Sequence, residues 1–231
     1  MNIALIIAGG VGTRMGNVVP KQFLKVNGKP VLVYTLEKFQ NHSQVDAIAV
    51  VCLKGWEEDV WVYKDEYNIG KLLHVFSGGE NGQQSIENGV FSLEKLYPAD
   101  TMILMHEAVR PLVTEQIITD CINTAKQFGN ATAAIPSVDT IMHTLDGKQS
   151  SEVIVREEVR KTQVPQAFTL QYMCSLYREA AQQGITNSAT TCILSAQLGK
   201  TVFFSPGSTL NFKLTTADDM KLFQAILDTQ L

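Results

Sequence analysis

The sequence predicts an α/β fold in which a mostly parallel sheet carries helices on both faces. Two observations support this. Short apolar runs alternate with stretches of helical periodicity over residues 1–135, and a glycine-rich turn directly follows the first run. Such alternation favours right-handed crossovers between parallel strands. The length of 231 residues suits one domain. We therefore expect a single domain over residues 1–231 with a protruding β-arm.

The first strand is expected at residues 3–7, because Ile3 to Ile7 form a continuous apolar run of the kind that is buried on both faces. Similar runs predict strands at 45–52, 72–76, 102–105 and 131–135. Apolar residues at helical spacing predict the helices between them: Leu32, Leu36 and Phe39; Val60, Tyr63 and Tyr67; Ile86, Val90 and Leu93; Ile117, Cys121 and Ala125. Ligands bind beyond the carboxyl ends of the strands in such sheets. The loops at 8–22, 78–85 and 106–111 are therefore expected to form the site.

The alternation weakens between Val138 and Val164, where the chain is polar and contains the hairpin-turn dipeptide Asp146-Gly147. We interpret residues 138–164 as an extended arm. Beyond the arm, the pattern predicts a helix near 170–181 and a strand near 201–204. A last helix is expected through Met220, Phe223 and Leu227.

Composition excludes several classes of protein. Nineteen Lys and Arg against 23 Asp and Glu give a net charge of −4, which argues against a nucleic-acid binder. The longest apolar stretch, Ile3 to Ala8, is too short for a membrane helix and lacks the flanks of a signal peptide. We therefore expect a cytoplasmic protein with no nucleic-acid or membrane partner. The four cysteines have no metal-binding spacing and are expected to be reduced core thiols.

The strongest chemical signal is the segment from Ala8 to Gly16, with Arg14 inside it and Lys21 soon after it. Glycines let backbone N–H groups approach an anion closely, and the two cations add positive charge. The segment is not a dinucleotide fingerprint, because its third glycine position holds Met15 and the second strand is followed by Lys54 rather than an acid. It is not a P-loop either, because Asn17 follows Gly16.

Several motifs occur together along the chain: Ala8-Gly9-Gly10-x-Gly12-Thr13-Arg14-Met15-Gly16 with Pro20-Lys21-Gln22; Gly78-Gly79 with Ser85-Ile86; His106-Glu107-Ala108-Val109-Arg110-Pro111; Asp139-Thr140-Ile141; Arg156 with Pro165-Gln166; and Asn211-Phe212-Lys213-Leu214-Thr215 with Asp219. This set resembles the cytidylyltransferases of the methylerythritol-phosphate and ribitol-phosphate type, within the sugar- and polyol-phosphate nucleotidyltransferases. The resemblance spans nearly the whole chain and implies a Rossmann-like fold.

The resemblance implies transfer of CMP from CTP to a polyol phosphate with release of pyrophosphate, in isoprenoid or teichoic acid biosynthesis. It implies catalytic roles for Arg14, Lys21, Arg156 and Lys213. The nucleotide would be bound by Ala8, Gly9, Gly10, Gly12, Gly79, Glu80, Ser85 and Ala108, with Gly79, Glu80 and Ser85 at the cytosine. The polyol phosphate would be bound by Arg110, Thr140, Arg156 and Lys213. Glu107 would bind Mg²⁺ (or another divalent cation) together with the phosphates. In the family the arm reaches into a partner subunit, which implies a homodimer.

Five departures from the family pattern leave the acceptor open. Glu107 replaces the usual Asp, Gly82 an Arg, Met142 a Lys and Val164 a Thr, and Thr186-Asn187-Ser188-Ala189 replaces an acidic segment. Methylerythritol phosphate, ribitol 5-phosphate and related polyol phosphates remain alternatives, and the Ala8–Gly16 loop favours the ribitol type. A non-catalytic nucleotide-binding regulatory module is the second hypothesis. A nicotinamide oxidoreductase, the third, is disfavoured by the failed fingerprint.

Overall fold

The computed structural model describes residues 1–10 and 19–229, and within them the central sheet has seven strands in the order β11-β7-β10-β6-β1-β4-β5. Their bounds are β1 (Asn2–Ala8), β4 (Ala47–Cys52), β5 (Leu72–Ser77), β6 (Met102–Glu107), β7 (Asn130–Pro136), β10 (Arg160–Thr169) and β11 (Phe204–Pro206). Within this central sheet, all paired strands run parallel except β10, which is antiparallel to both of its neighbours. The predicted α/β class with a mostly parallel sheet is therefore confirmed.

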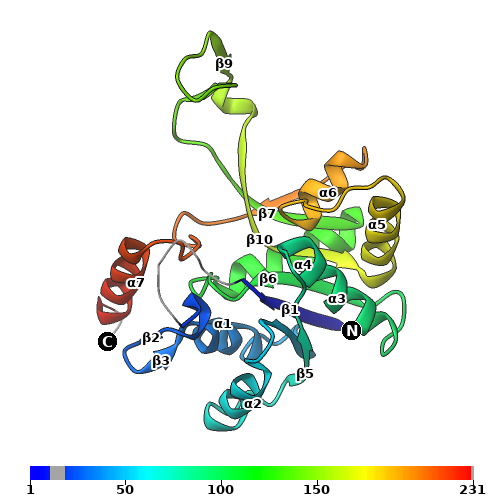
Figure 1. Cartoon of the computed structure of the whole chain (residues 1–231), viewed down its shortest axis with the longest axis vertical. Coiled ribbons are helices and arrows are strands. Elements are labelled where there is room, and N and C mark those ends of the chain that lie inside the picture. The colour runs from blue at the N-terminus through cyan, green and yellow to red at the C-terminus, as the bar shows by residue number, and fades with distance from the viewer. Residues whose placement is uncertain (11–18, 230–231) are drawn as a thin grey trace.

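Helices cover both faces of this sheet (Figure 1). One face packs against α1 (Val31–Gln40), α2 (Glu57–Glu66) and α4 (Glu115–Phe128), and the other against α3 (Gly82–Glu94), α5 (Leu170–Gln182) and α6 (Thr191–Gln197). The central strand β1 shows why: Ala4 and Ile6 belong to the first core, whereas Ile3 and Leu5 belong to the second. Successive side chains of a strand point to opposite faces, so a continuous apolar run is buried on both.

The last helix, α7 (Ala217–Thr229), packs apart from these two layers. Its Phe223 is fully buried against Val31, Val109 and Leu214, and its edge meets Tyr34. Short elements surround it: β2 (Lys25–Val26), β3 (Lys29–Pro30) and the 3₁₀ turn η2 (Lys21–Phe23). The chain that leads into α7 is thereby fixed next to the loop that follows β6, which matters for the site below.

The predicted arm is present as the hairpin β8 (Ile141–His143) and β9 (Glu152–Ile154), followed by the 3₁₀ turn η3 (Arg156–Glu158). It projects from the body of the molecule (Figure 1). The expected turn at Asp146-Gly147 is confirmed: Gly147 has φ +70°, and Asp146 Oδ1 accepts from the backbone N–H groups of Lys148 and Gln149 at 2.9 and 3.1 Å.

Several elements differ from those that the sequence predicts. Strand β10 was not predicted, and Arg160 already pairs with Pro136 in the main sheet, so the expected end of the arm at 164 lies inside a core strand. The polar start of β10 hides its strand pattern. Helix α6 was also missed, because seven residues are too few for a clear period, and β11 begins at Phe204, near the end of the predicted strand. Among the described residues, no helix is both long and apolar enough to cross a bilayer.

Candidate active site

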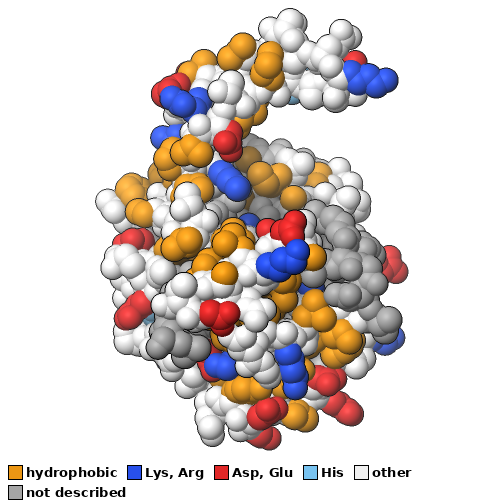
Figure 2. All heavy atoms as spheres, turned by 90° about the vertical axis from the view of Figure 1, so that its left-hand side faces the viewer, with side chains coloured by type: hydrophobic (Ala, Val, Ile, Leu, Met, Phe, Trp, Pro, Cys, Tyr) orange, Lys and Arg blue, Asp and Glu red, His pale blue; other side chains and the backbone are white. Residues whose placement is uncertain are grey.

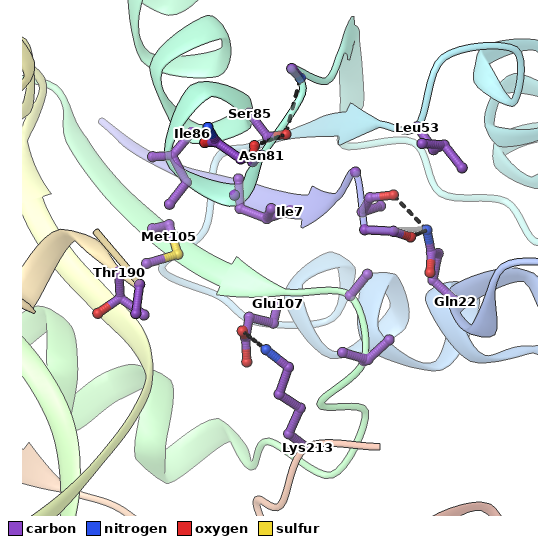
Figure 3. A pocket seen from close by; sticks show the side chains of 18 of the residues that line it. Ile7, Gln22, Leu53, Asn81, Ser85, Ile86, Met105, Glu107, Thr190 and Lys213 are labelled. Carbon is purple, nitrogen blue, oxygen red and sulfur yellow. Dashed lines mark hydrogen bonds and ion pairs between the residues drawn. The ribbon is translucent and has the colours of Figure 1, made fainter. Parts of the chain in front are cut away.

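A cavity of about 380 Å³ lies beyond the carboxyl ends of β1 and β6 (Figure 3). Ala8 ends β1 and Glu107 ends β6, and further parts of the wall come from the loops at 9–10 and 79–82, from 189–190, and from residues 21, 213 and 215. Many of the expected site residues meet here: Ala8, Gly9, Gly10, Lys21, Gly79, Glu80, Ser85, Glu107, Ala108 and Lys213. Gly12 and Arg14 lie outside the described residues. The cavity stands where ligands bind in open parallel sheets.

Close packing explains the glycines of the two loops. A Cβ on Gly9 would stand 2.9 Å from Ser85 Oγ, and a Cβ on Gly79 would stand 2.5 Å from Gln84 Cγ. A side chain at Gly9 would push the loop after β1 away from the start of α3, whereas one at Gly79 would displace the loop after β5 from Gln84 of α3. Gly9 therefore sets the distance between two walls of the cavity, and Gly79 lets the loop before α3 fold closely against that helix.

Ser85 holds the second of these loops together. Its Oγ accepts from the Gly79 N–H at 3.0 Å and donates to the Asn81 carbonyl at 2.9 Å. Asn81 in turn caps α3, since its side chain accepts from the Gln84 N–H at 2.9 Å. The single hydroxyl proton of Ser85 is thus already donated within the protein. Contact between Ser85 and cytosine stays a prediction. In the structure, the Ser85 hydroxyl fixes the position of Gly79.

Gln22 performs a similar task for the first loop, and the sequence analysis assigned it no role. It is buried, and its Nε2 donates to the Ala8 carbonyl at 2.7 Å and to the Gly10 carbonyl at 2.9 Å (Figure 3). One amide group therefore ties the end of β1 to Gly10, two residues further on. The signal in the sequence was its place directly after Lys21, which also lines the cavity.

Glu107 bridges two cations at the floor of the cavity. Its Oε1 pairs with Lys213 Nζ, and its Oε2 accepts from Arg110 Nε at 2.8 Å (Figure 3 shows the lysine contact). Burial raises the pKa of the Glu107 carboxyl, but the charges of Lys213 and Arg110 outweigh burial and hold that pKa below its usual range. The carboxylate is therefore ionised, and it neutralises part of the positive charge that an anionic ligand would meet.

Arg110 does not line the cavity but is held directly behind it. Its Nη1 donates to the Asn211 carbonyl at 2.7 Å, and its own carbonyl faces His106 Nε2 at 3.1 Å. Because a carbonyl only accepts, Nε2 carries the proton, and Nδ1 has no partner among the described residues. Burial lowers the pKa of His106 to about 4. His106 is thus a neutral support for Arg110, a role that the sequence analysis did not assign.

Lys213 reaches the cavity because its segment is anchored on both sides. Asn211 Nδ2 donates to the Val164 carbonyl at 2.7 Å, and the Leu214 N–H donates to the Val109 carbonyl at 2.9 Å. Further on, Asp219 Oδ2 accepts from the N–H groups of Thr215 and Thr216, both at 2.7 Å. Burial raises the pKa of Asp219, but these N–H donors and nearby Lys21 outweigh it and lower the pKa.

A match to a known protein family shows the family of the chain. The model of the 2-C-methyl-D-erythritol 4-phosphate cytidylyltransferase (IspD) family matches residues 2–229. The chain belongs to this family. It is therefore a nucleotidyltransferase, as the resemblance of its motifs implied, and the hypothesis of a non-catalytic module is not favoured.

Relatives of this cytidylyltransferase cover it from end to end. A protein of Lacticaseibacillus paracasei named ribitol-5-phosphate cytidylyltransferase is 40% identical over 229 residues, covering 98% of each chain. A protein of the same name from Vibrio parahaemolyticus is 38% identical over 231 residues, covering 100% of this chain and 97% of its own.

Solved structures agree with the fold. A 4-diphosphocytidyl-2C-methyl-D-erythritol synthase of Anaerococcus prevotii superposes with a TM-score of 0.83 at 24% identity, over 98% of this chain and 96% of its own. The 2-C-methyl-D-erythritol 4-phosphate cytidylyltransferase of Thermus thermophilus has a TM-score of 0.75 at 26% identity, over 97% and 98%.

Two expected acceptor residues of this cytidylyltransferase do not reach the cavity of their own chain. Thr140 and Arg156 lie on the exposed arm, and Arg156 Nη2 instead contacts Glu157 Oε1 at 3.3 Å. Neither residue lines the cavity. Their expected roles remain predictions that need a second copy of the chain.

The donor set around the cavity does not form a preformed metal site. Among the described residues, no group of three His, Cys, Asp or Glu side chains stands close enough to hold an ion. Glu107 is the predicted ligand, but both of its oxygens already contact cations. Mg²⁺ commonly binds through one or two carboxylates and otherwise through substrate phosphates. The residues therefore suit an ion that arrives with a triphosphate better than a resident one.

Proposed function

We propose that this enzyme transfers CMP from CTP to ribitol 5-phosphate and releases pyrophosphate. The observation that carries the proposal is the convergence of Gly9, Gly10, Lys21 and Lys213 on one cavity at the carboxyl edge of the sheet. The choice of ribitol 5-phosphate over 2-C-methyl-D-erythritol 4-phosphate is supported by the names of the relatives at 38–40% identity. The glycine-loop sequence favours the same choice.

The reaction forms a bond between a phosphate oxygen of the acceptor and the α-phosphorus of CTP, and it breaks the bond from that phosphorus to pyrophosphate. Such a transfer asks the protein mainly to position the reactants and to neutralise charge. We assign the triphosphate to Lys21 and Arg14, with N–H groups of Gly10 and Gly12 as additional donors. We assign the acceptor phosphate to Lys213, with Arg110 behind the cavity as the second cation on Glu107.

The cytosine is assigned to the loop that contains Gly79 and Glu80, with Ala8 and Ala108 on the facing walls. Gln84 Oε1 accepts from the Glu80 N–H at 2.7 Å, and Glu80 lines the cavity. A pyrimidine-selective site has to pair with the donors and acceptors of the base edge, and a loop held by Ser85 and Gln84 presents fixed backbone groups for that purpose.

Mg²⁺ is proposed to enter with CTP. When bound, it supplies positive charge to the phosphates. Glu107 is its candidate protein ligand. An ion bound to Glu107 Oε1 would compete with Lys213 Nζ, which already contacts that oxygen.

A homodimer is supported by the arm. Figure 2 shows hydrophobic side chains along it, and five of them are exposed by about half or more: Val138, Met142, Leu145, Val153 and Val155. Apolar patches on a projecting hairpin usually mark a protein interface. We propose that the arm binds a second copy, which brings Thr140 and Arg156 to the neighbouring cavity. A double substitution, Leu145→Lys with Val153→Lys, is expected to yield monomers in sedimentation analysis. Dimers that survive it would contradict this role.

We further propose that the enzyme works in the cytoplasm.

The test of the reaction is a pyrophosphate-release assay with CTP across ribitol, methylerythritol, glycerol and xylitol phosphates. We expect turnover that depends on Mg²⁺ and is highest with ribitol 5-phosphate. Arg14→Ala and Lys21→Ala are expected to cost about 3–4 kcal/mol of transition-state stabilisation, as for a lost charge-stabilising donor. Normal turnover by both variants would refute the roles assigned to them.

A further inference from the structure

Gln83 is a buried amide that lies outside the cavity wall and belongs to no motif discussed above. It is 4% exposed and stands in the first turn of α3, directly after the cavity residues Asn81 and Gly82. Its side chain is hydrogen-bonded to the chain that connects α5 to α6, not to residues 79–82, which we call the nucleotide loop.

Both ends of this amide bind that connection. Gln83 Nε2 donates to the Ile185 carbonyl at 2.7 Å, and Gln83 Oε1 accepts from the Ser188 N–H at 2.6 Å. Asn81 adds a longer contact, from Nδ2 to the Thr186 carbonyl at 3.4 Å. An amide that satisfies one donor and one acceptor of a remote backbone replaces the pairing that a strand would otherwise provide.

The connection depends on this amide because it has little other support. Residues 186–189 form no backbone–backbone hydrogen bond with another described residue. Within the connection, Ser188 Oγ donates to the Thr190 carbonyl at 3.3 Å. Ser188 is nevertheless buried, so its N–H would be unsatisfied without Gln83.

The end of the connection forms part of the cavity. Ala189 and Thr190 line it, and Figure 3 shows Thr190 beside Met105, across the cavity from Gln22. Met105 and Glu107 are two residues apart on β6 and both line the cavity. Thr190 therefore lies on the β6 side of the cavity, which Glu107 also lines and which holds the acceptor in the proposed function.

We propose that Gln83 is a positioning residue for the acceptor: it holds the 185–190 connection so that Ala189 and Thr190 form the acceptor wall at a fixed distance from the nucleotide loop. This inference rests on the proposed function, since it assigns the Glu107–Lys213 part of the cavity to the polyol phosphate. Gln83 itself contacts no substrate.

The first test is Gln83→Leu, which keeps the size of the side chain and removes both hydrogen bonds. We expect the KM for the polyol phosphate to rise about tenfold, as for one or two lost hydrogen bonds, while the KM for CTP changes less than about twofold. Equal rises in both KM values, or no change in either, would overturn the proposal. Gln127→Glu, at an exposed position of α4, is the control for a harmless change of a glutamine.

The second test is Gln83→Glu, which distinguishes positioning from a general loss of structure. A protonated carboxyl accepts from Ser188 and donates to Ile185, as the amide does, whereas a carboxylate can only accept. We compare the KM of this variant for the polyol phosphate with that of the wild type at the same pH. The ratio of the two KM values is expected to approach one at acidic pH and to rise with pH. A pH profile parallel to that of the wild type would contradict the proposal.

Hydrogen exchange separates this proposal from the proposed function, because it needs no turnover. The Ser188 amide is expected to exchange at least about tenfold faster in Gln83→Leu than in the wild type, and unchanged in Gln127→Glu. If the wild type turns over no polyol phosphate, the proposed function fails, whereas faster exchange in Gln83→Leu still supports the role of Gln83 in holding residues 185–190. If exchange at 185–190 is the same in Gln83→Leu and the wild type, that role of Gln83 is refuted.

Discussion

Lys213 and Glu107 form an ion pair between positions that are 106 residues apart in the sequence. The carboxylate ends a core strand, whereas the lysine lies on an irregular segment before the last helix. Arg110 binds the other oxygen of the same carboxylate at 2.8 Å. One acid thus holds in place Lys213, which we assign to the acceptor phosphate, and Arg110 directly behind it.

Removing Lys213 is expected to affect catalysis more than folding. Lys213→Ala leaves Glu107 paired with Arg110, so the carboxylate is not left uncompensated. We expect kcat/KM for the polyol phosphate to fall about 10²–10³-fold, the cost of one charge-stabilising donor. Steady-state kinetics of pyrophosphate release measure this. Lys221→Ala, at an exposed lysine of α7, is the matched control and should match the wild type. Equal activity of the two variants would exclude the role of Lys213.

His106 should make the stability depend on pH. It is buried as the neutral imidazole, with its pKa lowered by burial to about 4 against about 6.5 in an unfolded chain. The unfolded state therefore binds more protons between these two pKa values. The contribution of His106 to the free energy of unfolding is fully present above about pH 6.5 and is lost as the pH falls toward about 4. The loss from this residue is about 3 kcal/mol over the full window.

The comparison for His106 is His106→Gln, which keeps a donor for the Arg110 carbonyl but does not titrate. Urea unfolding from about pH 7 to about pH 4.5 should give a smaller acid-dependent loss in the variant than in the wild type. Identical slopes for the two proteins would show that His106 does not titrate in this way.

The approach of Gly9 to Ser85 can be tested with a double substitution. Gly9→Ala places a Cβ 2.9 Å from Ser85 Oγ, and we expect it to destabilise the fold by about 1–3 kcal/mol, as overpacking does, and to weaken CTP binding. Adding Ser85→Ala removes that oxygen and should recover part of the stability. Gly10→Ala is the steric control for stability, because its Cβ meets no atom of residues 1–10 and 19–229 within 4 Å. Strict additivity of the two substitutions would contradict the contact.

Gln22 should be required for CTP binding rather than only for folding. Gln22→Leu leaves the carbonyls of Ala8 and Gly10 without their donor, which costs about 1–3 kcal/mol for buried groups and frees the glycine turn. Calorimetry is expected to show weaker CTP binding at a temperature where the variant is still folded. Gln182→Leu, at an exposed position of α5, provides the comparison. CTP affinity equal to that of the wild type would mean that the turn keeps its shape without Gln22.

The sequence predicted the sheet well where physical periodicity is strong. The run Ile3–Ile7 became the central strand because every residue of it is apolar, and Leu32, Leu36 and Phe39 became one buried helix face. Strand β10 was missed, since its polar start carries no alternation and its pairing partners β6 and β7 come from earlier in the chain. Long-range pairing leaves little trace in a local pattern.

For the site, the sequence by itself determined which chemical groups are present: a glycine turn, cations at 14, 21 and 213, and a carboxylate at 107. Only the tertiary structure decided what these groups do to one another. It pairs Glu107 with Lys213 and Arg110, keeps His106 neutral, and holds the loops with the buried amides of Gln22 and Gln83. The physical reason is that charge pairing, desolvation and the hydrogen bonds of side-chain amides depend on distances across the fold. Residue identity and spacing do not contain those distances.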